Sequence, residues 1–303
     1  GIVSNSDGHK GRPGASHPGG TKFGSYGGLT CLLAPSFSRV GFMEALKKRH
    51  HYGTTGSRVV LDIRCIFDNP AELYSDDPNL GDVTFETSNE AMMGDILRSG
   101  DEEVTFKIDI HGSSPIERID IRNGLETLEV FRPYEEADLG GRIRVLWEGS
   151  EYRGRGRETV WDGYAELRSN SFESLRPINR YNLDKRFEQT APGRVEWVAL
   201  TTGGFGGFDA ILADPQAGTL RIDTDLVKEE IAIKDIGRNE LIFANGGIDR
   251  RIRIFRLPNE NLNFSSILER RIKLANDRDN ALYVRVTHED GHFVWSSPIY
   301  IFR

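Results

Sequence analysis

The sequence has few of the residues that build disulfide-rich, zinc-finger or membrane-spanning proteins. It contains two cysteines in 303 residues, Cys31 and Cys65, and neither has a C-x-x-C neighbour. A disulfide framework and a cysteine zinc site are therefore not supported, and two small buried thiols are expected. No apolar run approaches the roughly 20 residues that a membrane helix needs. No signal peptide begins at Gly1, where the residues resemble the interior of a longer protein, so the compartment stays open.

The net charge is also unlike that of proteins that coat nucleic acids or membrane surfaces. The chain holds 39 Lys and Arg against 46 Asp and Glu, a formal charge of −7. This total conceals an asymmetry, because residues 1–60 hold eight Lys and Arg against two acids. The other 243 residues hold 31 against 44. A basic part of an acidic chain predicts a small anionic ligand there, and neither nucleic acid nor a membrane as partner.

The first 60 residues differ in composition from all that follow. Nine glycines fall within the first 28 residues, which predicts mostly irregular backbone over residues 8–28. The apolar Ile2 and Val3 predict a buried strand that leads into this loop. A second strand is expected over residues 29–34.

A helix is expected after that strand. Ser38 is a suitable N-cap, and three apolar residues share one helical face: Val40, Met43 and Leu46. The basic residues 47–51 suit the negative end of the helix dipole, and Gly53 suits its end. This pattern favours a solvated helix end over a ligand-binding patch.

Residues 61–167 follow a period of two. Apolar and polar residues alternate most clearly at Val104, Phe106, Ile108 and Ile110. Asn123-Gly124 is typical of a tight hairpin turn. We therefore expect an antiparallel sandwich here.

Residues 168–303 are expected to form a second β-rich region. It begins with a polar stretch, residues 168–193, that reads as a long connection. Near its end Asp290-Gly291 predicts a two-residue hairpin turn. That turn would put His288 and His292 on opposite faces of the hairpin, so a shared metal is not expected.

The strongest candidate for chemistry is SNSDGHKGRPGASHPG, residues 4–19. One residue separates Asp7 from His9. This spacing allows a carboxylate oxygen and an imidazole nitrogen to point to one place. Such ligands suit Zn²⁺, Mn²⁺ or Fe. Arg12 has the geometry to bind a phosphate or carboxylate, and His17 is a further ligand or acid candidate. D-x-H pairs also arise by chance, and a solvated loop is the simpler interpretation of His17.

Several longer patterns extend this candidate. IVSNSDGH, residues 2–9, resembles the last metal-binding motif of the PHP (polymerase and histidinol phosphatase) superfamily of hydrolases. SDGHKGRPGA, YGGLT and EALKKRHHYGTTGSR follow it, at residues 6–15, 26–30 and 44–58. Together with YVRVTHEDGHFVWSSPIYI, residues 283–301, they resemble a PHP-related family that has a β-rich C-terminal extension.

The resemblance implies a metal-dependent phosphoesterase with two or three divalent ions held in a distorted β/α barrel. Asp7 and His9 would be metal ligands. Arg12, Arg58 and His17 are candidates for contact with the anionic substrate by their position in the sequence alone. The family's opening H-x-H motif is missing from these 303 residues. The chain therefore resembles the last strand, loop and helix of the barrel, residues 1–60, followed by mainly β regions over 61–167 and 168–303. We expect it to be inactive unless an N-terminal segment or a second chain completes the site.

A binding module without catalysis is the alternative. A β-sandwich that binds carbohydrate or protein would use exposed aromatic side chains, and the chain has four tryptophans: Trp147, Trp161, Trp197 and Trp295. Each lies in a strand-like run, where core packing is the commoner role. An exposed row of these rings would favour the module.

Overall fold

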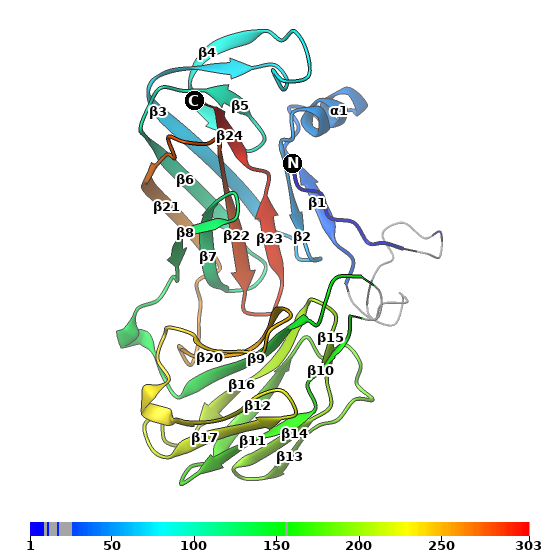
Figure 1. Cartoon of the computed structure of the whole chain (residues 1–303), viewed down its shortest axis with the longest axis vertical. Coiled ribbons are helices and arrows are strands. Elements are labelled where there is room, and N and C mark those ends of the chain that lie inside the picture. Colours follow the sequence, from blue (N-terminus) through cyan, green and yellow to red (C-terminus); the bar gives the residue numbers. More distant parts are fainter. Residues whose placement is uncertain (9–10, 12–16, 18–25, 155–156, 303) are drawn as a thin grey trace. The chain divides into compact units, whose positions relative to one another are not determined.

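The structure, a computed structural model, describes residues 1–8, 11, 17, 26–154 and 157–302. Strands hold 53% of the residues and helices 5%, which confirms the mainly β prediction. The chain divides into two compact units: unit 1 is Gly1–Pro133 with Leu262–Arg303, and unit 2 is Tyr134–Asn261. Both chain termini belong to unit 1 (Figure 1). The units differ from the three predicted segments because the chain leaves unit 1 after Pro133 and returns to it at Leu262.

Unit 1 contains twelve connected strands among the described residues. They follow the order β1-β2-β23-β22-β24-β5-β3-β6-β21, with β4 beside β3, β7 beside β22 and β8 beside β7. All of these ladders are antiparallel except β24–β5. The bounds are β1 Leu29–Leu32, β2 His51–Thr54, β3 Val60–Tyr74, β4 Phe85–Met92, β5 Ile96–Arg98, β6 Glu103–His111, β7 Ile116–Asn123, β8 Glu126–Phe131, β21 Ser265–Lys273, β22 Asn280–His288, β23 Phe293–Ser296 and β24 Ile299–Phe302.

Strands of unit 1 that are remote along the chain share one apolar core. The inward side chains of β3, β6 and β21 belong to the same buried cluster as those of β7, β22 and β24. The predicted alternation on β6 is confirmed, because its apolar residues are at most 1% exposed and Lys107 and Asp109 between them are exposed. The unit is therefore a sandwich held together by period-two burial.

Unit 2 is a second sandwich. One five-stranded sheet has the order β13-β14-β11-β17-β18 and the other β12-β16-β9-β20-β19, while β10 pairs with β15. Both sheets contribute to one core, in which the rings of Trp147 and Trp197 stack at 4.9 Å. The bounds are β9 Arg142–Ser150, β10 Thr159–Val160, β11 Gly163–Arg168, β12 Phe172–Ile178, β13 Phe187–Ala191, β14 Arg194–Trp197, β15 Leu200–Thr201, β16 Phe205–Leu212, β17 Thr219–Thr224, β18 Lys228–Ala232, β19 Leu241–Ala244 and β20 Ile248–Leu257, with short 3₁₀ helices η1 Glu136–Asp138 and η2 Ile233–Asp235.

The polar stretch at residues 168–193 is not a long connection, so that prediction is wrong. It contains β12 and β13. Each lies at the edge of its five-stranded sheet. Edge strands bury little and tolerate polar residues and proline, which here include Pro177 within β12. Their composition therefore resembles that of a loop.

The structure does not support a β/α barrel portion in residues 1–60. Such a barrel needs parallel strands, whereas β1 pairs antiparallel with β2, and β2 pairs antiparallel with β23. The helix predicted between them is present as α1, Arg39–Lys47, and Ser38 Oγ caps it by accepting from Gly41 N at 3.0 Å. Gly53 does not end this helix, because it lies within β2.

Both predicted hairpins form, but neither has the predicted register. The hairpin between β7 and β8 is confirmed, but Asn123 pairs with Glu126, so the turn residues are Gly124-Leu125, one residue beyond the predicted Asn123-Gly124. Between β22 and β23, Thr287 lies opposite Phe293, so the predicted register is wrong by one residue.

That shift sets His288 and His292 opposite each other near the turn. The backbone N of His288 donates to the carbonyl of His292 at 2.9 Å. Nδ1 of His288 donates to the carbonyl of Ser114 at 2.8 Å. Burial lowers the pKa of His288, so its ring is neutral at pH 7.

We predict that Phe106→Ala lowers the free energy of unfolding of unit 1 by about 3–5 kcal/mol, because the ring is fully buried and its loss leaves a cavity. Leu125→Ala is the control, since Leu125 is 96% exposed, and should change it by less than about 0.5 kcal/mol. Protein labelled with 5-fluorotryptophan is unfolded in urea, and the signal of Trp295 reports the unfolding of unit 1, because the other three tryptophans lie in unit 2. Equal effects of both substitutions would contradict the assigned core.

Candidate functional site at the N-terminal clamp

The first residues lie along β1 and β2 without joining the sheet as a strand. Ile2 N donates to Ser297 Oγ at 3.1 Å. Ser4 N donates to Thr30 Oγ1 at 2.9 Å, and the same hydroxyl donates to the Ser4 carbonyl at 2.9 Å. The Thr30 hydroxyl therefore satisfies both backbone polar groups of Ser4, which the backbone of a neighbouring strand would otherwise satisfy. The strand expected at Ile2 and Val3 is replaced by an extended segment held by side chains.

His51 holds the same segment from β2. Its Nδ1 donates to the Ile2 carbonyl at 2.8 Å, and Ser297 Oγ donates to the His51 carbonyl at 2.6 Å. Burial lowers the pKa of His51 and outweighs the opposing effect of the bond to Ile2. We call these contacts of Ile2 and Ser4 with Thr30, His51, Gly53 and Ser297 the N-terminal clamp.

Gly53 leaves room for Ser4 in the clamp, because a Cβ at position 53 would displace the Ser4 side chain. A Cβ on Gly53 would lie 2.3 Å from Ser4 Oγ, and one on Gly28 would lie 2.9 Å from Ser4 Cβ. Both distances are shorter than real Cβ contacts. The glycines of YGGLT and HHYGTTG thus let the N-terminal segment approach the sheet.

A second anchor lies on the turn that follows β2. Gly56 has φ of +121°, and a Cβ there would lie 2.8 Å from the Cβ of Tyr26. The rings of Tyr26 and His292 lie 5.6 Å apart, and His292 Nδ1 is 3.0 Å from Thr55 Oγ1. Ser4 at Gly53 and Tyr26 at Gly56 therefore attach both flanks of residues 5–25 to the same end of β2.

The two anchors assemble segments that are far apart in the sequence. They come from residues 1–4, 26–30, 51–57 and 292–297, which overlap four of the five patterns that carried the family resemblance. The neighbouring positions of β1, β2 and β23 in the sheet are visible in Figure 1. The structure thus brings the distinctive sequence patterns of unit 1 to one place.

The predicted ligand residues are only partly within the described chain. Asp7 is exposed and has φ of 48°, and His17 and Arg58 are also exposed. His9 and Arg12 lie outside the described residues. Within the part of the chain that is described, no three His, Cys, Asp or Glu side chains gather as a metal site requires. Asp7 and His9 remain predicted ligands.

The tryptophans do not form an exposed row. Trp147, Trp161 and Trp197 are at most 4% exposed, which confirms the expectation of core packing for these three. Trp295 is half-buried, and its ring lies 5.3 Å from that of Phe293. The aromatic surface offered by tryptophan is therefore confined to β23.

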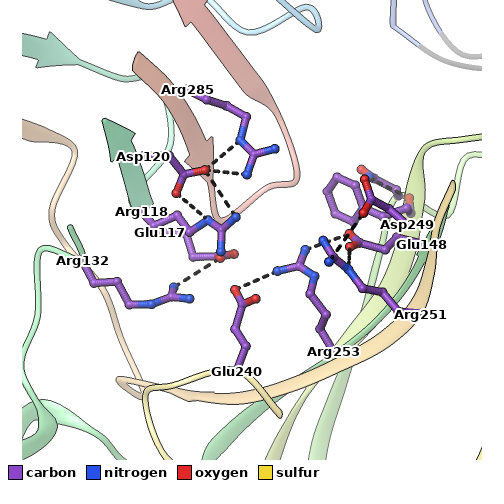
Figure 2. Close-up of polar contacts among 12 residues, drawn as sticks. Glu117, Arg118, Asp120, Arg132, Glu148, Glu240, Asp249, Arg251, Arg253 and Arg285 are labelled. Carbon is purple, nitrogen blue, oxygen red and sulfur yellow. Dashed lines mark hydrogen bonds and ion pairs between the residues drawn. The ribbon is translucent and has the colours of Figure 1, made fainter. Parts of the chain in front are cut away.

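Buried ion pairs are the other concentration of charge in unit 1. Asp120, 1% exposed, accepts from Arg285 Nε at 2.8 Å and pairs with Arg118 at 3.2 Å (Figure 2). Glu117 pairs with Arg132 at 3.4 Å. Each buried charge has an opposite charge beside it, as a structural ion pair requires.

Unit 2 has its own buried ion pairs. Arg253 donates to Glu240 at 2.8 Å and to Glu148 at 3.0 Å (Figure 2). Asp209 lies 2.7 Å from Arg144 Nε. Burial alone would raise the pKa of Asp209, but Arg144 and a second arginine outweigh it and lower the pKa. These carboxylates pair with arginines within the fold, so the clamp is the better functional candidate.

Comparisons of the chain with protein-family models, with curated proteins and with solved structures find no match. Among the described residues, no helix has the length and apolar character needed to cross a membrane.

We predict that Gly53→Ala releases the N-terminal segment, because the new methyl group would collide with Ser4. Amide hydrogen exchange at Ile2 and Ser4 should become faster, while exchange in β6 is unchanged. Gly100→Ala is the matched control, since a Cβ at Gly100 would meet nothing within 4 Å. Unchanged exchange at Ser4 in Gly53→Ala would show that the clamp does not hold this segment.

Proposed function

We propose that this chain supplies part of the site of a metal-dependent hydrolase that acts on a phosphoester. Asp7 and His9 contribute two metal ligands, and an N-terminal segment or another chain contributes the others. The observation that carries the proposal is the clamp, which fixes the backbone up to Ser4, three residues before Asp7. A metal ligand must be held in place, and the clamp restrains the approach to this one.

The charge of the first 60 residues supports an anionic substrate. Eight Lys and Arg stand against two acids there. Arg12, His17 and Arg58 are the residues that we assign to contacts with the phosphate. When bound, Zn²⁺, Mn²⁺ or Fe would activate water and neutralise the developing phosphoryl charge.

The proposal requires that the chain by itself be inactive. A catalytic metal site uses at least three protein ligands, and the sequence pattern offers two. Asp7 and His9 alone should therefore bind a divalent ion weakly and give no turnover.

A carbohydrate- or protein-binding module is the second candidate. It is favoured by the half-buried Trp295 beside Phe293, with the Arg285 guanidinium 6.0 Å from the centroid of the Phe293 ring. It has less support because the other three tryptophans are buried. This candidate predicts a fluorescence change at Trp295 on addition of an oligosaccharide, which the hydrolase does not.

We predict that substoichiometric MnCl₂ broadens the backbone NMR signals around residues 7–9, and that Asp7→Asn or His9→Gln abolishes the broadening. The chain also contains a matched control with the same D-x-H spacing. Asp109 and His111 are exposed on β6, with His111 Nε2 3.0 Å from Asp109 Oδ1. Asp109→Asn should leave the broadening at residues 7–9 unchanged.

Two results would contradict this proposal. One is equal broadening at residues 7–9 and 109–111, since any exposed D-x-H pair would then suffice. The other is hydrolysis of p-nitrophenyl phosphate by this chain alone that persists in Asp7→Asn, since catalysis would then use other residues.

A further inference from the structure

Helix α1 exposes the large apolar face that its sequence pattern predicts. The helix buries two small residues, Gly41 and Ala45. Val40 is 76% exposed, Met43 50% and Leu46 40%. A helix at a protein surface usually turns its large apolar residues inward, so α1 has the reverse arrangement.

The residue before the N-cap enlarges this surface. Phe37 is 97% exposed, and its ring meets that of Phe42 edge-on at 5.3 Å. Singly exposed apolar residues are ordinary, but a contiguous apolar group marks an interaction site. We call Phe37, Val40, Met43 and Leu46 the α1 face.

A groove of about 530 Å³ runs beside this face. One wall of the groove is formed by α1 and the residue that follows it, along the whole length of the helix. The other wall is formed by the two residues that follow β3. The lining residues are Arg39, Val40, Met43, Glu44, Lys47, Lys48, Ser75 and Asp76. A concave groove with apolar side chains along one wall suits a protruding apolar side chain of a partner.

The groove has two basic residues that do not pair within the described chain, and these favour a partner with negative charges. Glu44 already pairs with Lys48 at 3.4 Å, and Asp76 lies 3.8 Å from Arg49. Among the described residues, Arg39 and Lys47 form no ion pair. They stand at the two ends of α1, about 12 Å apart at a rise of about 1.5 Å per residue.

We propose that the α1 groove binds an acidic helical segment of a different protein. An apolar side chain of that segment packs on Val40 and Met43. Carboxylates about eight residues apart on the segment pair with Arg39 and Lys47. The inference is independent of the proposed metal site, because it uses none of the predicted ligands.

Two other occupants fit the same charges less well. A second copy that packed α1 antiparallel on α1 would set Arg39 against the partner copy's Lys47, a like-charge contact. An anionic membrane is flat, whereas this surface is grooved, and Glu44 and Asp76 would face the lipid headgroups.

The test is fluorescence anisotropy with a labelled 18-residue helical peptide that carries leucines on one face and two glutamates eight residues apart. Binding in the micromolar range is expected, weakening as NaCl increases. Val40→Glu should weaken it at least about tenfold. Ile267→Glu should not, and it is the matched control because Ile267 is also 76% exposed. The charge-reversed variant R39E/K47E should prefer a peptide with lysine in place of each glutamate.

Four results would overturn the inference. The first two are absence of peptide binding at millimolar concentration and binding that Val40→Glu leaves unchanged. The third is a dimer in sedimentation velocity that Val40→Glu abolishes, which assigns the groove to a second copy. The fourth is cosedimentation with phosphatidylserine vesicles that the same variant abolishes, which assigns it to a membrane.

Discussion

The backbone of residues 2–4 lies against a sheet without being a strand of it, and the candidate site depends on how its polar groups are satisfied. A partly buried N–H or C=O without a partner costs free energy, and the N–H and C=O of both Ile2 and Ser4 have partners. Side chains of Thr30, His51 and Ser297 provide the pairs. Glycine at position 53 leaves room for this close approach, because a Cβ there would lie 2.3 Å from Ser4 Oγ. These contacts restrain the chain just before Asp7.

The same reasoning separates what the sequence predicts well from what it does not. Period-two alternation predicted the burial of β6, because both faces of a half-buried strand are encoded in adjacent residues. It failed for β12 and β13, because edge strands bury too little to show the pattern. It gave no information about the return of the chain to unit 1 at Leu262, which depends on pairing between distant strands.

The candidate site shows a similar division. The segment with Asp7 was evident from its composition, and the clamp residues were not, because threonine, serine and glycine are common and their partners lie far away in sequence. Gly53 was interpreted from its helical neighbours, whereas its role is set by Ser4. On α1 the spacing predicted which residues share a face. It could not predict that this face is exposed, because periodicity does not identify the side that packs on the protein.

Side chains, and not a strand ladder, hold the N-terminal segment on the sheet. The most direct measurement is hydrogen exchange of the Ser4 amide in the unmodified protein and in Thr30→Val, which removes the hydroxyl and keeps the shape. The Ser4 amide should exchange slowly in the unmodified protein, relative to a peptide of the same sequence, and fast in Thr30→Val. Peptide-like exchange of Ser4 in the unmodified protein, or slow exchange that persists in Thr30→Val, would contradict this mode of attachment.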